Sequence, residues 1–223
     1  MQDLSLMTWK EAAEIDKDKS ILFVTVAPIE EHGVHLPLAT DLIEGENWSG
    51  GAMKILEQTT EYRCYFLPAF PIAAASVNSF YGCIHFPMRT VYKVVRELLE
   101  SVACMGFRNV VVVASHADPE HQIAVEKAVR SINRRYGEIA ISPKRQRAAM
   151  GEYGHMGDPT AADYQIGKLL NEDCAEYLAR AARCFAKRDG YQTFTHYAMY
   201  DIVFLHLGFL PMLGRVKRKK VSK

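Results

Sequence analysis

Apolar runs of strand length recur along the chain, with segments of helical periodicity between them. The runs ILFVTVA (21–27) and NVVVVAS (109–115) are apolar at nearly every position, and RCYFLPAFPIAAAS (63–76) and EIAIS (138–142) are shorter extended candidates. A strand without polar alternation is typical of a parallel sheet that is buried on both faces. The pattern therefore predicts an α/β fold with helices on both sides of a mostly parallel sheet.

Helix signals fill the intervals between these runs. Thr8 and Glu11 have the spacing of a capping box in front of a short first helix. Further helices are predicted from apolar spacing and from their first residues: 42–58, 91–105 behind Thr90 as N-cap, Pro119 to Tyr136, and a long one with Asp158 as N-cap and Pro159 in its first turn.

Two loops rich in histidine and acidic residues come directly after two of the predicted strands. The segment PIEEHGVHLPLATD (28–41) follows 21–27, and ASHADPEH (114–121) begins where 109–115 ends. Reactive groups gather beyond the carboxyl ends of parallel strands, so we expect both loops at the same edge of the sheet. Neither loop alone indicates a functional site, but the two together do.

The side chains in these loops are of the types that bind transition metals. In an extended segment residues two apart point the same way, so Glu30 and His32 face one side and Glu31 the other. Imidazoles and carboxylates together suit zinc or manganese better than calcium, which prefers oxygen ligands alone. The sequence predicts two divalent ions with a shared ligand, held by Glu30, His32, Asp41, His116 and Asp118.

A metal pair of this kind supports hydrolysis. It lowers the pKa of a bridging water, so that hydroxide is available near neutral pH, and it polarises the carbonyl under attack. His155, in the glycine-rich segment EYGHMGDP, is the candidate for donating a proton to the leaving group. Neighbouring polar residues could orient ligands or line the substrate pocket: His35, Glu31, Asn78, Tyr153 and Asp158.

Some of these residues also have a purely structural interpretation. Asp118 and Asp158 each precede a proline that opens a predicted helix, so each could simply be an N-cap. His121 has no partner pattern and is assigned to a structural or exposed position.

Composition narrows the class of protein. The chain has 223 residues with a net charge of +1, and the basic run RVKRKK (215–220) is typical of a solvated tail, so no nucleic-acid partner is expected. The longest apolar stretch, 202–213, is too short to span a membrane. Five cysteines without a C-x-x-C pair indicate free thiols in a reducing compartment, and we expect a cytoplasmic protein with a small-molecule substrate.

At this point the motifs resemble those of a known family. PIEEHGVHLPLATD resembles the E-x-H-G-x-H-L-P-L-x-T-D signature of the creatininase (creatinine amidohydrolase) family, and FPMRT, GFRNVVVVASHADPE and GHMGDPTAAD are similar to its later segments. The resemblance covers most of residues 20–170. It implies a three-layer α/β/α sandwich, a homo-oligomer (usually a hexamer), and one hydrolase domain over 1–223 in which 191–223 is a C-terminal extension of unknown role.

The resemblance also implies roles for particular residues. It assigns metal ligation to the five residues named above, with Asp118 standing where creatininase has a glutamate, and it assigns proton shuttling to His155. Creatininase closes a tryptophan-bearing loop over its substrate, whereas the corresponding segment here, 142–157, has Tyr153 as its aromatic residue. We therefore expect hydrolysis of a C–N bond in a small cyclic amide other than creatinine.

Two alternatives remain open. Within the family, the same hydroxide could deformylate a formamidopyrimidine or open the C–C bond of a cyclic keto-inositol of the 3-dehydro-scyllo-inosose type. An alternative of another class is a metal-binding protein without catalytic activity, which the non-standard segments ASHADP and HMGDP suggest.

Overall fold

A five-stranded parallel sheet forms the centre of the described part of the protein. The computed structural model describes residues 1–75, 81–143, 163–189, 202 and 204–205. Within them the strand order is β1-β3-β2-β4-β5, and every neighbouring pair is parallel. The strands are β1 (Gln2–Asp3), β2 (Ser20–Val26), β3 (Arg63–Phe70), β4 (Val110–Val113) and β5 (Ala140–Ile141).

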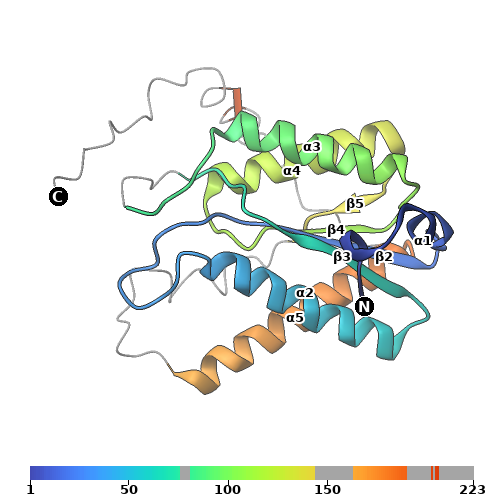
Figure 1. Ribbon diagram of the computed structural model, residues 1–223, viewed down its shortest axis with the longest axis horizontal. Helices are drawn as coiled ribbons and strands as arrows, with labels where there is room; N and C mark the ends of the chain where they lie inside the picture. The colour runs from blue at the N-terminus through green and yellow to red at the C-terminus, as the bar shows by residue number, and fades with distance from the viewer. Residues whose placement is uncertain (76–80, 144–162, 190–201, 203, 206–223) are drawn as a thin grey trace.

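Helices cover both faces of this sheet. In Figure 1, α3 and α4 lie on one side of the strands, and α2 and α5 lie on the other. This arrangement confirms the predicted three-layer α/β/α sandwich. The helices are α1 (Trp9–Glu14), α2 (Thr40–Thr59), α3 (Met88–Cys104), α4 (Pro119–Tyr136) and α5 (Tyr164–Ala186), and a short 3₁₀ turn, η1, spans Leu4–Leu6.

The central strand β2 shows why its sequence has no polar alternation. Leu22, Val24 and Val26 pack into the core beneath α3 and α4. Ile21 and Phe23, which alternate with them, pack into the core beneath α2 and α5. Because a hydrophobic layer covers each face, both sets of side chains are removed from water, and the strand is apolar throughout.

The start of α3 differs from the prediction. Thr90 was expected to be the N-cap, but the helix begins at Met88 behind Pro87. The carbonyl of Pro87 accepts hydrogen bonds from the backbone N–H groups of Thr90 and Val91, at 2.8 and 3.1 Å. The first turn therefore already includes Thr90. The fixed φ of proline suits this position, which a search for polar caps overlooks.

The start of α5 also differs from the prediction. Its N-cap is Asp163, whose carboxylate accepts a hydrogen bond from the Ile166 N–H at 2.9 Å. The sequence placed the start of this helix at Pro159 behind Asp158, and those two residues lie outside the described part of the chain. The capping box of Thr8 and Glu11, in contrast, is confirmed.

Two further observations concern the described chain as a whole. No helix within the described residues is both long enough and apolar enough to cross a lipid bilayer. All five cysteines are free thiols.

Close packing of α2 on α5 provides a test of the layer arrangement. A Cβ added at Gly51 would lie 2.6 Å from the Ala175 Cβ, whereas one added at Gly50 would meet nothing within 4 Å. We expect Gly51→Ala to lower the free energy of unfolding by about 1–3 kcal/mol through overpacking. Gly50→Ala is the matched control and should raise it by up to about 1 kcal/mol through helix propensity. Urea unfolding measures both, and equal effects would contradict the close contact.

Candidate metal centre

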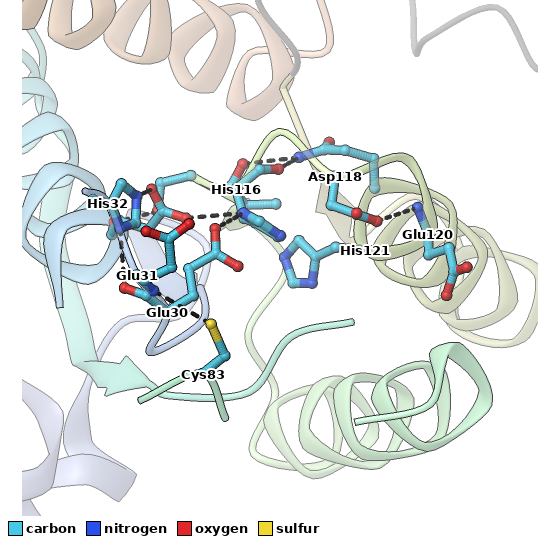
Figure 2. A network of polar contacts seen from close by, with 12 residues as sticks. Glu30, Glu31, His32, Cys83, His116, Asp118, Glu120 and His121 are labelled. Atoms are coloured by element: carbon cyan, nitrogen blue, oxygen red, sulfur yellow. Dashed lines mark hydrogen bonds and ion pairs between the residues drawn. The ribbon is translucent and has the colours of Figure 1, made fainter. Parts of the chain in front are cut away.

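The two histidine-rich loops meet at one edge of the sheet. Strands β2 and β4 are parallel neighbours, with Leu22 paired to Val110 and Thr25 paired to Val113. Their carboxyl ends therefore lie side by side, and the loop after each strand emerges at the same place. Figure 2 shows side chains from both loops directed toward one another. This confirms the predicted convergence of the loops.

Four of the predicted ligands form a buried cluster. Glu30, His32, Asp41 and His116 are 8%, 4%, 6% and 8% exposed. The carboxylate of Asp41 lies between the two imidazoles, with Oδ1 3.0 Å from His32 Nε2 and Oδ2 2.9 Å from His116 Nδ1. His116 Nδ1 also lies 3.3 Å from Glu30 Oε1. Candidate ligand atoms of Glu30, His32 and Asp41 all lie within 4.8 Å of one another, so these three residues could hold a metal ion.

The backbone of the loop after β2 determines which of its side chains point into the cluster. Glu30 and His32 point into the cluster, whereas the Glu31 carboxylate turns back to accept the Gly33 N–H at 3.0 Å. Gly33 has a φ of 74°, a conformation that few residues other than glycine adopt, and it starts the turn. The Glu30 N–H donates to the Leu38 carbonyl at 3.0 Å and closes the loop. The predicted alternation of the side chains is confirmed.

Segment 81–86 borders the loop on another side. Ile84 forms an antiparallel bridge with Ile29. Beside this bridge, the thiol of Cys83 accepts a hydrogen bond from the Glu31 N–H at 3.4 Å (Figure 2). These contacts hold the extended stretch around Glu30 in place from outside the cluster.

Close packing of α2 brings Asp41 to the imidazoles. Asp41 lies in the first turn of α2, and its backbone carbonyl accepts a hydrogen bond from Ser115 Oγ at 2.7 Å. One turn later is Gly45, where an added Cβ would lie 2.5 Å from Ser115 Oγ and 2.6 Å from Thr25 Cγ2. The helix can approach the strand ends this closely because residue 45 has no side chain.

A glutamine in α4 fixes the second loop. Gln122 Nε2 donates to the carbonyl of Ala114 at 3.1 Å and also to the carbonyl of His116. These hydrogen bonds fix the loop to the first turn of α4. The His116 ring is thereby held beside Asp41 and Glu30.

The charges of the cluster balance one another. Burial raises the pKa of Asp41, but the hydrogen bonds from His116 and His32 outweigh it and bring the pKa to about 2. The hydrogen bond to Asp41 raises the pKa of His32 to about 9 against the effect of burial. Burial lowers the pKa of His116, but the hydrogen bond to Asp41 and the charge of Glu30 raise it overall. Protonated imidazoles thus compensate the buried carboxylates when no other cation is present.

The donor set fits a divalent transition metal. His32 Nδ1 donates to the Glu30 backbone carbonyl at 3.1 Å, so Nε2 is the nitrogen that faces the carboxylates. A histidine that binds a metal usually has this arrangement, with one N–H on a backbone carbonyl and the other nitrogen on the ion. His116 Nε2 is buried without a hydrogen-bond partner in the described part of the chain. Two imidazoles and two carboxylates match zinc or manganese.

Asp118 has a structural role in the described chain. Its Oδ1 accepts the Glu120 N–H at 2.8 Å and caps α4, as one of the two interpretations predicted. Asp118 is half-buried and is not part of the three-residue ligand group. Its charge nevertheless raises the pKa of Glu30 and His116, so it lies close to the cluster. Metal ligation by Asp118 stays a prediction.

Of the five remaining predicted residues, one lies in the described part of the chain. His35 is exposed. Four others lie outside the described residues: Asn78, Tyr153, His155 and Asp158.

One neighbour of the cluster was missed by the sequence. His121 was assigned a structural or exposed position, yet it is fully buried and its ring centroid lies 5.5 Å from that of His116. A sequence feature that could have indicated this is the position of His121 three residues after Asp118, which places both residues on one side of the first turn of α4.

The fold and this cluster define a class of protein: an α/β/α sandwich with a buried carboxylate–imidazole centre at the carboxyl edge of its sheet. A model of the family described as "Creatininase: Creatinine amidohydrolase" matches residues 5–151, more than half of the chain. The chain therefore belongs to the creatininase family, a family of hydrolases. No curated protein matches it in a sequence search.

Solved structures share the fold at low sequence identity. A Bacteroides fragilis NCTC 9343 protein assigned as a creatinine amidohydrolase superposes with a TM-score of 0.66 at 17% identity, covering 85% of this chain and 98% of its own. A manganese form of creatininase gives 0.64 at 14% identity, covering 81% and 97%. A mutant creatininase of zinc–zinc type gives 0.62 at 15% identity, covering 81% and 96%.

The hydrogen bond between His32 and Asp41 predicts a pH dependence of the metal-free protein. The pKa of His32 is raised from 6.5 to about 9, so its stabilising contribution is complete below pH 6.5 and is lost as the pH rises to about 9. We expect the unfolding free energy of chelator-treated protein to fall across this interval. The fall should be much smaller in Asp41→Asn, and unchanged in the control Glu31→Gln, whose carboxylate points away. Urea unfolding at several pH values measures it, and identical profiles in all three proteins would contradict the assignment.

Proposed function

We propose that this protein is a metal-dependent hydrolase that binds a divalent ion, zinc or manganese, through Glu30, His32, Asp41 and His116. Its substrate is a small cyclic molecule, and the reaction is attack on a carbonyl or amidine carbon with cleavage of a C–N bond. The observation that carries the proposal is the buried carboxylate of Asp41 between two imidazoles, at the edge of the sheet where α/β proteins place their ligands. Membership of the creatininase family supports it.

The cluster is suited to this chemistry before any ion binds. A divalent ion, when bound, supplies an acidified water and polarises the substrate carbonyl. The protein supplies fixed positions: the Glu30 carbonyl orients the His32 ring, and Ser115 holds the turn that carries Asp41. Burial keeps water away from these groups, which strengthens every electrostatic interaction among them.

A second ion and a proton donor complete the proposal. Asp118, whose charge raises the pKa of both Glu30 and His116, is the proposed carboxylate for the second ion. His155 is proposed to protonate the leaving group on the strength of its sequence context, since it lies outside the described residues.

The proposed substrate is a cyclic amide other than creatinine. Segment 142–157 contains no tryptophan. Trp9 is exposed on α1, and Trp48 on α2 donates its indole N–H to Asn171 Oδ1 at 2.8 Å. An aromatic ring that stacks on a flat heterocycle contributes about 0.5–1.5 kcal/mol, and no tryptophan of segment 142–157 supplies it.

Metal content tests the binding part of the proposal. Plasma mass spectrometry of protein purified without chelators should find about two equivalents of zinc or manganese per chain, because the proposed site holds two ions, as two-metal hydrolytic sites do. Asp41→Asn, which removes the carboxylate shared by both imidazoles, should lose most of this metal. The matched control Glu31→Gln should keep it. A wild-type protein without tightly held metal would contradict the proposal.

Turnover of a substrate panel tests the catalytic part. We expect hydrolysis of at least one cyclic amide, lost on chelation and restored by zinc or manganese. Asp41→Asn should lower kcat/KM by more than the roughly 10–100-fold that loss of a residue orienting a metal ligand costs. A ring-opened product that carries both a new amine and a new carboxylate supports the proposal, whereas formate, or a keto-inositol opened to an acid without a new amine, identifies one of the two alternative reactions. Full metal occupancy without turnover of any cyclic amide or keto-inositol would identify a non-catalytic metal-binding protein.

A further inference from the structure

The outer surface of α5 has an ordered pattern of charges that lies apart from the metal centre. Helices α2 and α5 lie side by side and form the layer on one side of the sheet (Figure 1). One side of α5 packs into the core of this layer, where Leu178, Ala182 and Phe185 are buried. The opposite side of α5 therefore faces away from the core.

This outer side is acidic in the middle of the helix and basic in its last turns. Residues three or four apart lie along one side of a helix. The charged residues that follow this spacing on the outer side of α5 are Glu172, Asp173, Glu176, Arg180 and Arg183. The first four of them are exposed, and Arg183 is half-buried. The helix dipole favours acidic residues only in the first turn, so it does not account for acidic residues in the middle of α5.

A groove lies along these charges, between α5 and the second half of α2. It has a volume of about 320 Å³, and its lining is both apolar, with Ile55, Leu56 and Tyr177, and charged, with Glu176 and Arg180. The Arg180 guanidinium lies 5.9 Å from the centroid of the Tyr177 ring. Within the described part of the chain, neither Glu176 nor Arg180 forms an ion pair. The groove therefore combines an apolar floor with charges of both signs that lack partners of opposite sign.

The order of the charges makes this surface complementary to itself. Glu176 and Arg180 are each two residues from Leu178, and Asp173 and Arg183 are each five residues from it. If a second α5 lies antiparallel to the first, with a two-fold axis level with Leu178, each glutamate or aspartate of one copy faces an arginine of the other. A parallel arrangement would instead bring like charges together. A contact between two identical surfaces requires this kind of symmetry.

We propose that this face, formed by residues 55–59 of α2 and 173–183 of α5, binds a second copy of the chain, whose α5 lies antiparallel in the groove. The apolar lining provides the surface that is removed from water, as in the centre of other protein interfaces. The charge pairs fix the orientation and disfavour the parallel one. None of the proposed metal ligands is part of this face, so the proposal does not depend on the proposed function.

Reversal of single charges tests the contact. Glu176→Arg gives both members of the pair with Arg180 a positive charge, and Arg180→Glu gives both a negative charge. Sedimentation equilibrium of the full chain over a range of concentrations measures self-association. We expect wild-type protein to self-associate, and the dissociation constant of each single variant to rise at least roughly tenfold, because like charges then face each other. Glu97→Arg, at a side chain 65% exposed on α3 across the sheet, is the matched control and should leave association unchanged.

An equimolar mixture of the two variants shows whether the charges meet between copies. One copy is then basic at both positions and the other acidic at both, so every pair across the two-fold axis is again of opposite sign. The mixture should regain the association of wild-type protein, although each variant alone has lost it. Mixing cannot repair a defect within one chain, because each chain keeps its own substitution. A mixture that stays dissociated would overturn the antiparallel contact.

Two further results would also overturn the proposal. A wild-type protein that is monomeric at every concentration would identify the face as a solvated surface. Association that is unchanged in both single variants would show that copies of the chain meet through another surface. Metal content, measured on the same samples, should be equal in wild-type protein and in both variants, so a failure of this proposal is distinguishable from a failure of the proposed function.

Discussion

The buried carboxylate of Asp41, held between His32 and His116, is the interaction on which the site depends. It joins the loop after β2, the first turn of α2 and the loop after β4, which are far apart in the sequence. A carboxylate and two protonated imidazoles cannot be buried singly at acceptable cost, because each charge needs a partner once water is excluded. The cluster therefore links three segments of the chain and is also a candidate metal site.

The packing around Asp41 connects the core to the chemistry. Gly45 lets α2 approach Thr25 and Ser115, and Ser115 then holds the backbone of the turn in which Asp41 lies. A change in the seating of α2 would move Asp41 relative to the imidazoles, even though no ligand was altered. Metal sites require ligand positions that are accurate to a fraction of an ångström, so the close approach of helix and strands is part of the site.

His116 is the centre of the donor arrangement. Its Nδ1 is engaged by Asp41 and Glu30, its ring centroid lies 5.5 Å from that of His121, and Asp118 caps the helix that carries His121. A single helix start therefore supplies a capping group, a nearby negative charge and a buried imidazole. Asp118 caps α4, and because an N-cap carboxylate can also coordinate an ion, this role does not exclude the proposed metal ligation.

The sequence by itself determined the layers and much of the site. Apolar runs with no alternation identified β2 and β4, and the two-residue period of extended chain placed Glu30 and His32 on one side, because both features depend only on local geometry and burial. It did not identify Pro87 as the start of α3, or His121 as a neighbour of His116. The contact of Asp41 with both imidazoles and the approach of α2 at Gly45 likewise came only from the tertiary structure. These depend on how far one helix slides over a sheet and which side chains then meet, and no local periodicity records that distance.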